Sequence, residues 1–202
     1  AEYVAEQILE VFDKQPNLTS ASLGVNDSGW RGYCQCDRCK ALDVPGKVSV
    51  HGGPDYSNRF FTFANRVAEK VATKYPDHHL GCLAYSACEN PPTFKVHPMV
   101  VPYLTNDRAQ WRDRRFADAD RRWIAAWRAA APSVATYTYE YGAGYVVPRV
   151  YPRLQKQYMQ FAKDQGVKGW YAEIYSNWLL DGPKAWIGSQ LLWDTDQRVE
   201  GL

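Results

Sequence analysis

The stretch FFTFANRVAEKVATKYPDHHLGCLAYS, residues 60–86, decides the fold that this sequence predicts. Its first half repeats apolar side chains at helical spacing up to Val71, and the pattern is closed by Pro76, so we expect a helix that ends between them. Residues 80–86 then form a short apolar run that is typical of a buried strand. A helix that leads into a buried strand is the repeating unit of a parallel α/β fold.

The same alternation extends in both directions from this stretch. We expect five strands in all, at residues 18–25, 80–86, 99–104, 134–139 and 167–174. Helical patterns at residues 4–12, 116–131, 152–161 and 183–193 accompany them. The first strand is followed by an unusually long connection that runs to about residue 55. Helices between strands predict βαβ units with parallel strands.

The strand count predicts an incomplete barrel. A full (β/α)8 TIM barrel needs about 250 residues, whereas this chain has 202 residues and five strands. We therefore expect one partial-barrel catalytic domain over residues 1–202, which lacks the N-terminal part of the barrel. Because the sequence starts on a helix and without Met, we expect it to be a fragment of a longer protein. An open doubly wound sheet is the alternative, but no strand is followed by a GxGxxG or GxxxxGK[ST] loop.

Composition narrows the class of partner. Lys and Arg number 24 against 22 Asp and Glu, so the net charge of +2 favours neither nucleic acid nor a membrane surface. No stretch has 18 uninterrupted apolar residues, and the N-terminus lacks the pattern of a signal peptide, so we expect no membrane span. Aromatic residues make up 14%, with 8 Trp and 14 Tyr against 7 Phe. Trp and Tyr suit flat, hydroxylated ligands such as sugars, as well as core packing.

Acidic and aromatic side chains follow several of the predicted strands. Asp27 follows the first strand, Glu140 follows the fourth, and Glu173 ends the fifth. Because the carboxyl ends of parallel strands meet at one edge, we expect these three acids to converge there as catalytic residues. The polar and aromatic residues beside them are candidates for substrate binding: Asn26, Tyr85, Tyr139, Tyr141, Tyr175, Asn177 and Trp178.

Three strand-end acids beside aromatic rings favour glycoside hydrolysis. That reaction needs one acid to protonate the leaving oxygen and one carboxylate to attack or stabilise the anomeric carbon. Each acid taken alone also has an ordinary explanation as a helix cap, a turn former or a solvated side chain. The turn explanation fits Asp27 best, because Ser28 and Gly29 follow it.

The long connection carries a cluster of cysteines. Cys34, Cys36 and Cys39 lie within six residues, and Cys82 and Cys88 bring the total to five. The cluster predicts a structural zinc site, a disulfide or a redox pair. A structural zinc ion would take its fourth ligand from His51, Cys88 or Cys82. We favour a structural role, in which the cluster pins the connection from residue 26 to residue 55, and we expect no required cofactor.

An arginine-rich segment precedes the fourth strand. Six arginines between Arg112 and Arg128 alternate with Asp113, Asp118 and Asp120. This pattern predicts a solvated, ion-paired helix face rather than a phosphate site.

Several segments together resemble a known family. They are GVNDSGWRGYCQCDRCKALD, RFFTFANRVAEKVATKYPDHHLGCLAYSACENPP, and GVKGWYAEIYSNW followed by AWIGSQLLWD. They resemble the carbohydrate-active domain catalogued as domain of unknown function 4838 and linked to glycoside hydrolase family 163. The resemblance implies a secreted or periplasmic TIM-barrel hydrolase, with endo-β-N-acetylglucosaminidase activity on N-glycans in some members. The segment from Trp170 to Glu173 is also similar to the last barrel strand of family 20 hexosaminidases.

The family 20 similarity assigns roles to the acids. It places Asp27, Glu140 and Glu173 at the ends of barrel strands four, seven and eight. Asp27 is then the general acid/base, Asn26 contacts the substituent at sugar carbon two, Glu140 is the nucleophile or stabiliser, and Glu173 binds sugar hydroxyls. A second assignment makes Glu173 catalytic and Glu140 supporting. In a third, a 2-acetamido group of the sugar attacks, and Asn26 and Asp27 orient and protonate.

The leading hypothesis is therefore a retaining glycoside hydrolase whose partners are a glycan and the remainder of its own barrel and accessory domains. The alternatives are a non-catalytic carbohydrate-binding module and a zinc-stapled interaction domain. Five strands without closing partners would expose sheet edges and apolar surface, so we expect the isolated chain to be poorly soluble or inactive.

Overall fold

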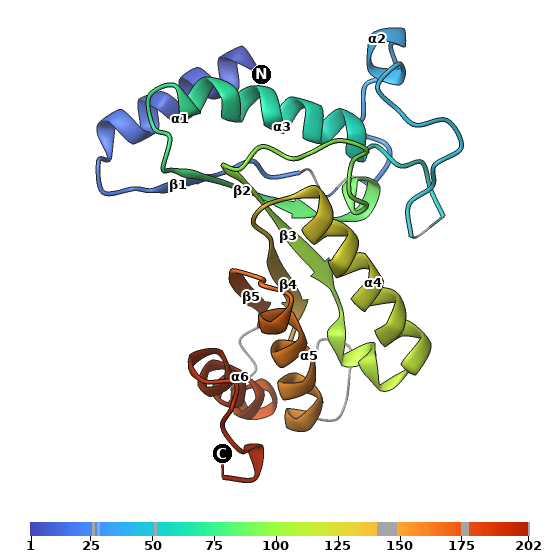
Figure 1. Ribbon diagram of the computed structural model, residues 1–202, viewed down its shortest axis with the longest axis vertical. Helices are drawn as coiled ribbons and strands as arrows, with labels where there is room; N and C mark the ends of the chain where they lie inside the picture. Colours follow the sequence, from blue (N-terminus) through green and yellow to red (C-terminus); the bar gives the residue numbers. More distant parts are fainter. Residues whose placement is uncertain (26, 28, 51, 141–148, 175–177, 202) are drawn as a thin grey trace. The chain divides into compact units, whose positions relative to one another are not determined.

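The computed structural model describes residues 1–25, 27, 29–50, 52–140, 149–174 and 178–201. Five parallel strands are accompanied by helices, an α/β arrangement consistent with a partial barrel (Figure 1). The strands are β1 (Ser20–Ser22), β2 (His79–Ala84), β3 (Val100–Asn106), β4 (Ala135–Tyr139) and β5 (Gly169–Glu173), and they follow one another in sequence order in the sheet. The predicted fold class is confirmed. That residues 1–202 form one barrel domain stays a prediction.

The helices follow the predicted stripes. They are α1 (Glu2–Lys14), α2 (Asp37–Lys40), α3 (Ser57–Ala72), α4 (Arg114–Ala130), α5 (Pro152–Asp164) and α6 (Trp178–Trp193), with short 3-10 turns η1 (Ser86–Cys88), η2 (Arg108–Arg112) and η3 (Val199–Gly201). The prediction for the last helix was wrong at its start. Pro183 lies inside α6 rather than at its first position, so the helix continues past a residue that lacks the N–H for a helical hydrogen bond.

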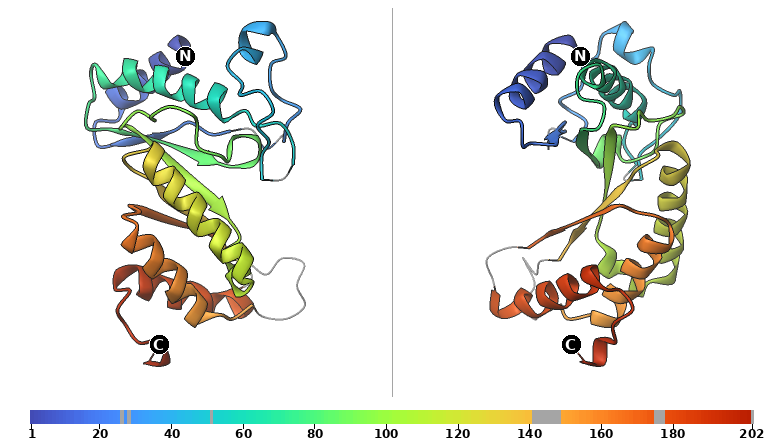
Figure 2. Two further views of the ribbon diagram at one scale, coloured as in Figure 1. Left: turned by 45° about the vertical axis from the view of Figure 1, so that its right-hand side comes forward. Right: turned by 60° about the vertical axis from the view of Figure 1, so that its left-hand side comes forward.

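By its internal contacts the chain forms two compact units, each described here by itself. The N-terminal unit comprises Ala1–Leu104 and Ala126–Val134. In it, β1 pairs with β2 from Ser20↔His79, and β2 pairs with β3 from Leu80↔Val100, both in parallel. Helices α1 and α3 pack side by side (Figure 2). Every second residue of β2 is buried, as the strand period requires when helices cover one face only.

The C-terminal unit comprises Thr105–Ala125 and Ala135–Leu202. Here β4 pairs with β5 in parallel, from Ala135↔Gly169 to Tyr139↔Glu173. Helices α5 and α6 pack against each other, and α5 also packs against η2. The core of this unit consists of Trp111, Ala117, Tyr158, Met159 and Leu191. The register of β4 and β5 sets the positions of two of the predicted catalytic acids.

Candidate functional site

Two of the predicted acids lie at the carboxyl ends of neighbouring strands in the C-terminal unit. Glu173 is the last residue of β5 and is paired with Tyr139 of β4. Glu140 follows β4 directly, and its backbone N–H donates to the carbonyl of Glu173 at 3.0 Å. The two backbones are therefore in direct contact. Because side chains alternate along a strand, Glu173 shares a face with Tyr139, whereas Glu140 lies on the opposite face.

The face that carries Glu173 is lined with tyrosine. The Tyr137 hydroxyl donates to Glu173 Oε2 at 2.5 Å. The Tyr137 ring stacks on Tyr171 at 4.7 Å between ring centroids and contacts Tyr139 edge-on at 5.6 Å. Burial, followed by the hydrogen bond to Glu173, raises the pKa of Tyr137 well above its ordinary range, so the hydroxyl stays a donor. A carboxylate held by a phenol beside half-exposed rings is a suitable surface for a sugar.

Glu140 faces the helices and is buried. Its carboxylate accepts hydrogen bonds from Tyr151 at 3.0 Å, from Gln155 Nε2 at 3.2 Å, and from Tyr158. Gln155 also donates to the carbonyl of Lys184, which joins the network to α6. Glu140 is only 2% exposed.

The burial of Glu140 changes its acidity. Desolvation raises the pKa of Glu140 above its ordinary value of 4.5, although the hydrogen bonds from Tyr158 and Tyr151 and the nearby charge of Lys184 act in the opposite direction. The Lys184 ammonium forms an ion pair with Asp181 at 2.9 Å, and both side chains are buried. Glu140 is thus a buried acid that several groups hold in one place.

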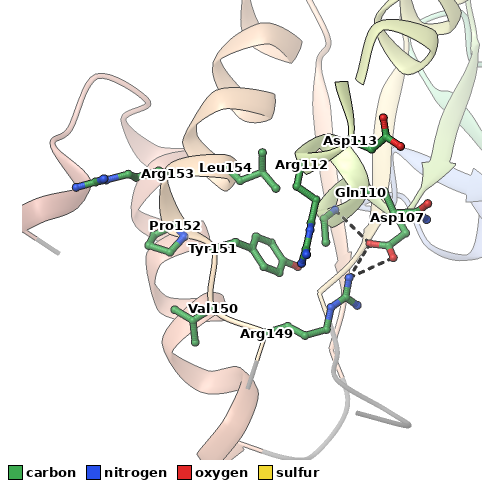
Figure 3. A pocket seen from close by; sticks show the side chains of 11 residues that line it. Asp107, Gln110, Arg112, Asp113, Arg149, Val150, Tyr151, Pro152, Arg153 and Leu154 are labelled. Carbon is green, nitrogen blue, oxygen red and sulfur yellow. Dashed lines mark hydrogen bonds and ion pairs between the residues drawn. The ribbon is translucent and has the colours of Figure 1, made fainter. Parts of the chain in front are cut away.

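A cavity of about 930 Å³ opens beside this network in the C-terminal unit. Its walls come from η2 and from the segment that leads into α5, which are the regions that follow β3 and precede α5. Figure 3 shows Arg149 pointing at Asp107, where its Nη2 lies 3.2 Å and 3.3 Å from the two carboxylate oxygens. Tyr151 also lines the cavity, and its hydroxyl donates to Glu140. The cavity is therefore one side chain away from the Glu140 carboxylate.

The third predicted acid, Asp27, lies in the N-terminal unit, after β1. It is exposed, and one of its oxygens accepts a hydrogen bond from the Tyr85 hydroxyl at 3.2 Å. The structure thus brings Asp27 together with one predicted substrate-binding residue, Tyr85. Within the C-terminal unit, it does not bring Glu140 and Glu173 together on one face.

Comparison with known proteins identifies the family. Residues 1–202 match the family model described as Domain of unknown function (DUF4838). The chain is a DUF4838 domain. No curated protein matches it. The family part of the predicted resemblance is confirmed, since the match covers the whole chain.

Several predicted site residues of the DUF4838 domain fall outside the part of the chain that the structure describes. They are the substrate-binding candidates Asn26, Tyr141, Tyr175 and Asn177, together with His51, a candidate zinc ligand. Trp178 begins α6, and its side chain is 65% exposed. Among the described residues, no helix of the domain is long and apolar enough to cross a membrane.

The expectation of a wholly solvated arginine-rich helix was wrong at one position. Asp120 of α4 is buried and accepts hydrogen bonds from Arg108 Nε at 3.1 Å, Trp111 Nε1 at 2.8 Å and Asn106 Nδ2 at 2.7 Å. Arg108 also donates to the carbonyl of Tyr137 at 3.2 Å. This buried ion pair supports the strand that carries Tyr137. Periodicity gave no signal for it, because the partners of Asp120 lie in β3 and η2 and not in the same helix.

The cysteine-bearing connection of the DUF4838 domain is held to α3 by polar contacts. Arg59 donates to the Asp43 carboxylate and to the carbonyl of Cys34. The Tyr33 hydroxyl lies 2.9 Å from Cys88 Sγ, and the buried Asp55 carboxylate accepts from Asn90 at 2.7 Å. Residues of the connection are therefore tied to the helix and the turn beside them.

Proposed function

We propose that the DUF4838 domain is a retaining glycoside hydrolase that acts on glycans, and that Glu173 is its carboxylate at the anomeric carbon. The resemblance to glycoside hydrolase family 163 favours β-N-acetylglucosaminide bonds of N-glycans and a secreted or periplasmic location. The observation that carries the proposal is the position of Glu173. It accepts a hydrogen bond from Tyr137 and lies beside tyrosine rings, on the strand face opposite the one that carries Glu140. This choice adopts the second of the assignments that the sequence leaves open.

Tyr137 supports a role for Glu173 by fixing the position of its carboxylate. A phenol that donates to one carboxylate oxygen holds the other oxygen in a defined orientation. The rings of Tyr137, Tyr139 and Tyr171 lie next to it and offer apolar faces to the C–H groups of a sugar. Both features are what a group that stabilises or attacks an anomeric carbon requires.

The proposed reaction has two steps. In the first, a Glu173 oxygen bonds to the anomeric carbon as the glycosidic C–O bond breaks, and a protein carboxylic acid gives its proton to the leaving oxygen. In the second, water attacks the anomeric carbon, the bond to Glu173 breaks, and the same acid recovers a proton from the water. The sequence prediction assigns this acid to Asp27, and the Asp27→Asn variant tests that assignment separately.

Glu140 has a different role in this proposal. It is buried, its carboxylate accepts hydrogen bonds from Tyr151, Gln155 and Tyr158, and it faces α5 rather than the face that carries Glu173. We therefore assign Glu140 as a positioning residue, which fixes the end of β4 and, through its backbone N–H, the carbonyl of Glu173.

The cavity beside Tyr151 supplies a second surface for a glycan. Guanidinium and carboxylate groups at its wall, such as Arg149 and Asp107, can hydrogen-bond vicinal sugar hydroxyls. We assign it to sugar units that do not react.

The experiment that tests the function uses the protein with its complete native sequence. It is incubated with N-glycans and with chitooligosaccharides, new reducing ends are detected by mass spectrometry, and binding of the same glycans is measured by calorimetry. The proposal expects cleavage with retention of the anomeric configuration. NMR of the newly formed product measures that configuration. Binding without cleavage would instead support a carbohydrate-binding module, and neither binding nor cleavage would support an interaction domain.

A further inference from the structure

Three cysteine thiols converge in the connection between β1 and α3. The Sγ atoms of Cys34, Cys36 and Cys39 all lie within 4.8 Å of one another. Cys34 and Cys36 are exposed and Cys39 is half-buried, and no two of these sulfurs are bonded to each other. Three sulfurs this close to one another can converge on one metal ion, and zinc binds thiolate sulfur at about 2.3 Å.

We propose that Cys34, Cys36 and Cys39 form a structural zinc site with three thiolate ligands. This site is independent of the proposed hydrolase activity. The thiols come from a single short segment, and Cys36 immediately precedes the helical turn α2, which contains Cys39. The backbone N–H groups of Cys39 and Lys40 both donate to the carbonyl of Cys36, which closes the CxxC segment into a tight turn. This turn brings the two sulfurs to the same side.

The surroundings of the cluster suit an anionic metal centre. Three thiolates and one Zn²⁺ carry a net charge of minus one, which a neighbouring cation stabilises. Arg59 of α3 provides it, because its guanidinium donates to the Cys34 carbonyl at 2.5 Å. Asp43 holds Arg59 from the other side. The same arginine therefore ties the connection to α3 at two points, Cys34 and Asp43.

The other two cysteines do not belong to this site. Cys88 is buried and contacts the Tyr33 hydroxyl, and Cys82 is buried within β2. Among the described residues, no fourth thiol, imidazole or carboxylate joins the cluster. Their exclusion makes Cys82 a suitable control, because its removal lowers the number of thiols and leaves the proposed ligands intact.

The ion would serve the fold and not the reaction. In the described part of the connection between β1 and α3, the regular structure is one four-residue helix and one isolated bridge, Val48↔Pro54. A metal ion that links three residues of such a segment offsets part of the chain entropy that is lost when the segment is ordered. Zinc, with thiolate ligands and tetrahedral preference, fits better than the oxygen-binding cations.

The test loads the full chain with Zn²⁺ alone, under reducing conditions, and measures bound metal after gel filtration. We expect about one equivalent of zinc, as for a single site. The Cys36→Ser variant should retain less than a tenth of the zinc that the native chain holds, whereas the Cys82→Ala control should retain as much as the native chain. If native protein and Cys36→Ser hold equal amounts, or if neither holds zinc, the proposal is wrong.

A second measurement does not depend on whether the variants fold. The native chain is alkylated with iodoacetamide, with and without zinc, and the modified cysteines are located by mass spectrometry. Zinc should protect Cys34, Cys36 and Cys39 together, and a chelator should expose all three. If two of these cysteines resist alkylation without metal and react only after a reductant is added, they form a disulfide and not a metal site. Replacement by Co²⁺ should give thiolate-to-cobalt charge-transfer absorption, and its absence would also overturn the proposal.

Discussion

The backbone N–H of Glu140 donates to the carbonyl of Glu173 at 3.0 Å, yet the two carboxylates lie on opposite faces of β4 and β5. Among the described residues, Glu140 accepts hydrogen bonds from Tyr151, Gln155 and Tyr158, and Glu173 accepts a hydrogen bond from Tyr137. Two acids that face away from each other cannot both contact the same anomeric carbon. Their roles therefore differ, and the variants below separate them.

Replacing Glu140 should change how stability depends on pH. Burial raises the pKa of Glu140 above 4.5, so the folded chain binds this proton more tightly than the unfolded chain does. The resulting stabilisation is complete at a pH below 4.5 and is lost as pH rises through the folded-state pKa. Glu140→Gln cannot ionise, so its free energy of unfolding should increase relative to that of the native chain as the pH rises above 4.5. Urea unfolding at a series of pH values measures this difference.

The control for that series is Glu69→Gln, on the exposed side of α3. Its stability should follow the native pH dependence throughout. If the curves for Glu140→Gln and the native chain are parallel between pH 4.5 and 8, burial does not govern the ionisation of Glu140.

Removing the Tyr137 hydroxyl should affect turnover more than substrate binding. Tyr137→Phe keeps the ring and its stacking on Tyr171 but deletes the donor to Glu173. A hydrogen bond to a charged group contributes about 1.5–3 kcal/mol, so kcat should fall roughly tenfold or more while KM stays nearly constant. Tyr171→Phe removes a hydroxyl from a side chain that is 52% exposed and should leave kcat almost unchanged. A rise in KM with native kcat would assign Tyr137 to binding instead.

The buried ion pair between Asp120 and Arg108 should be important for stability. Asp120→Asn leaves the Arg108 guanidinium buried beside a neutral partner, and breaking such a pair typically costs about 3–5 kcal/mol. Asp118→Asn is the matched control, because Asp118 lies on the exposed side of the same helix and contacts exposed or half-buried arginines. It should change the free energy of unfolding by about 0.5 kcal/mol or less. Equal effects of the two variants in urea unfolding would contradict this account.

If the cavity binds part of the substrate, a change in its wall should alter KM without altering kcat. Arg149→Ala removes the guanidinium that contacts Asp107 and lines the cavity, so KM for a long glycan should rise about tenfold with little change in kcat. Arg114→Ala, an exposed arginine that does not line the cavity, should leave both constants unchanged. If Arg149→Ala leaves KM unaltered for long glycans, the cavity does not bind the substrate.

Local patterns in the sequence predicted where the elements lie but not all of their bounds, since the first strand, predicted over residues 18–25, spans Ser20–Ser22. Helix α3 (Ser57–Ala72) contains the predicted stripe, and strand β2 (His79–Ala84) overlaps the predicted run 80–86, because a helical stripe and an apolar run both arise from burial. The start of α6 was missed because Pro183 resembles a first-turn proline, and nothing local shows that the preceding turn is also helical.

Long-range relations could not be predicted in the same way. Sequence placed Glu140 and Glu173 correctly next to strand ends, but the face that each occupies depends on where its strand ends and on what packs beside it. Asp120 looked solvated because its neighbours in sequence are charged, while its partners Arg108 and Trp111 come from another element. Burial of a charged group is decided by such partners.

Glycan turnover by Glu173→Gln tests the central claim most directly. The amide keeps the size of the side chain and removes its charge, so initial rates on the best glycan should fall by roughly 10²–10⁴-fold, in the range of a positioned catalytic group. Glycan affinity by calorimetry should stay within a few-fold of native, because the rings of Tyr137 and Tyr171 remain. A Glu173→Gln protein that turns over glycan at the native rate would contradict the assignment of Glu173 to the reaction.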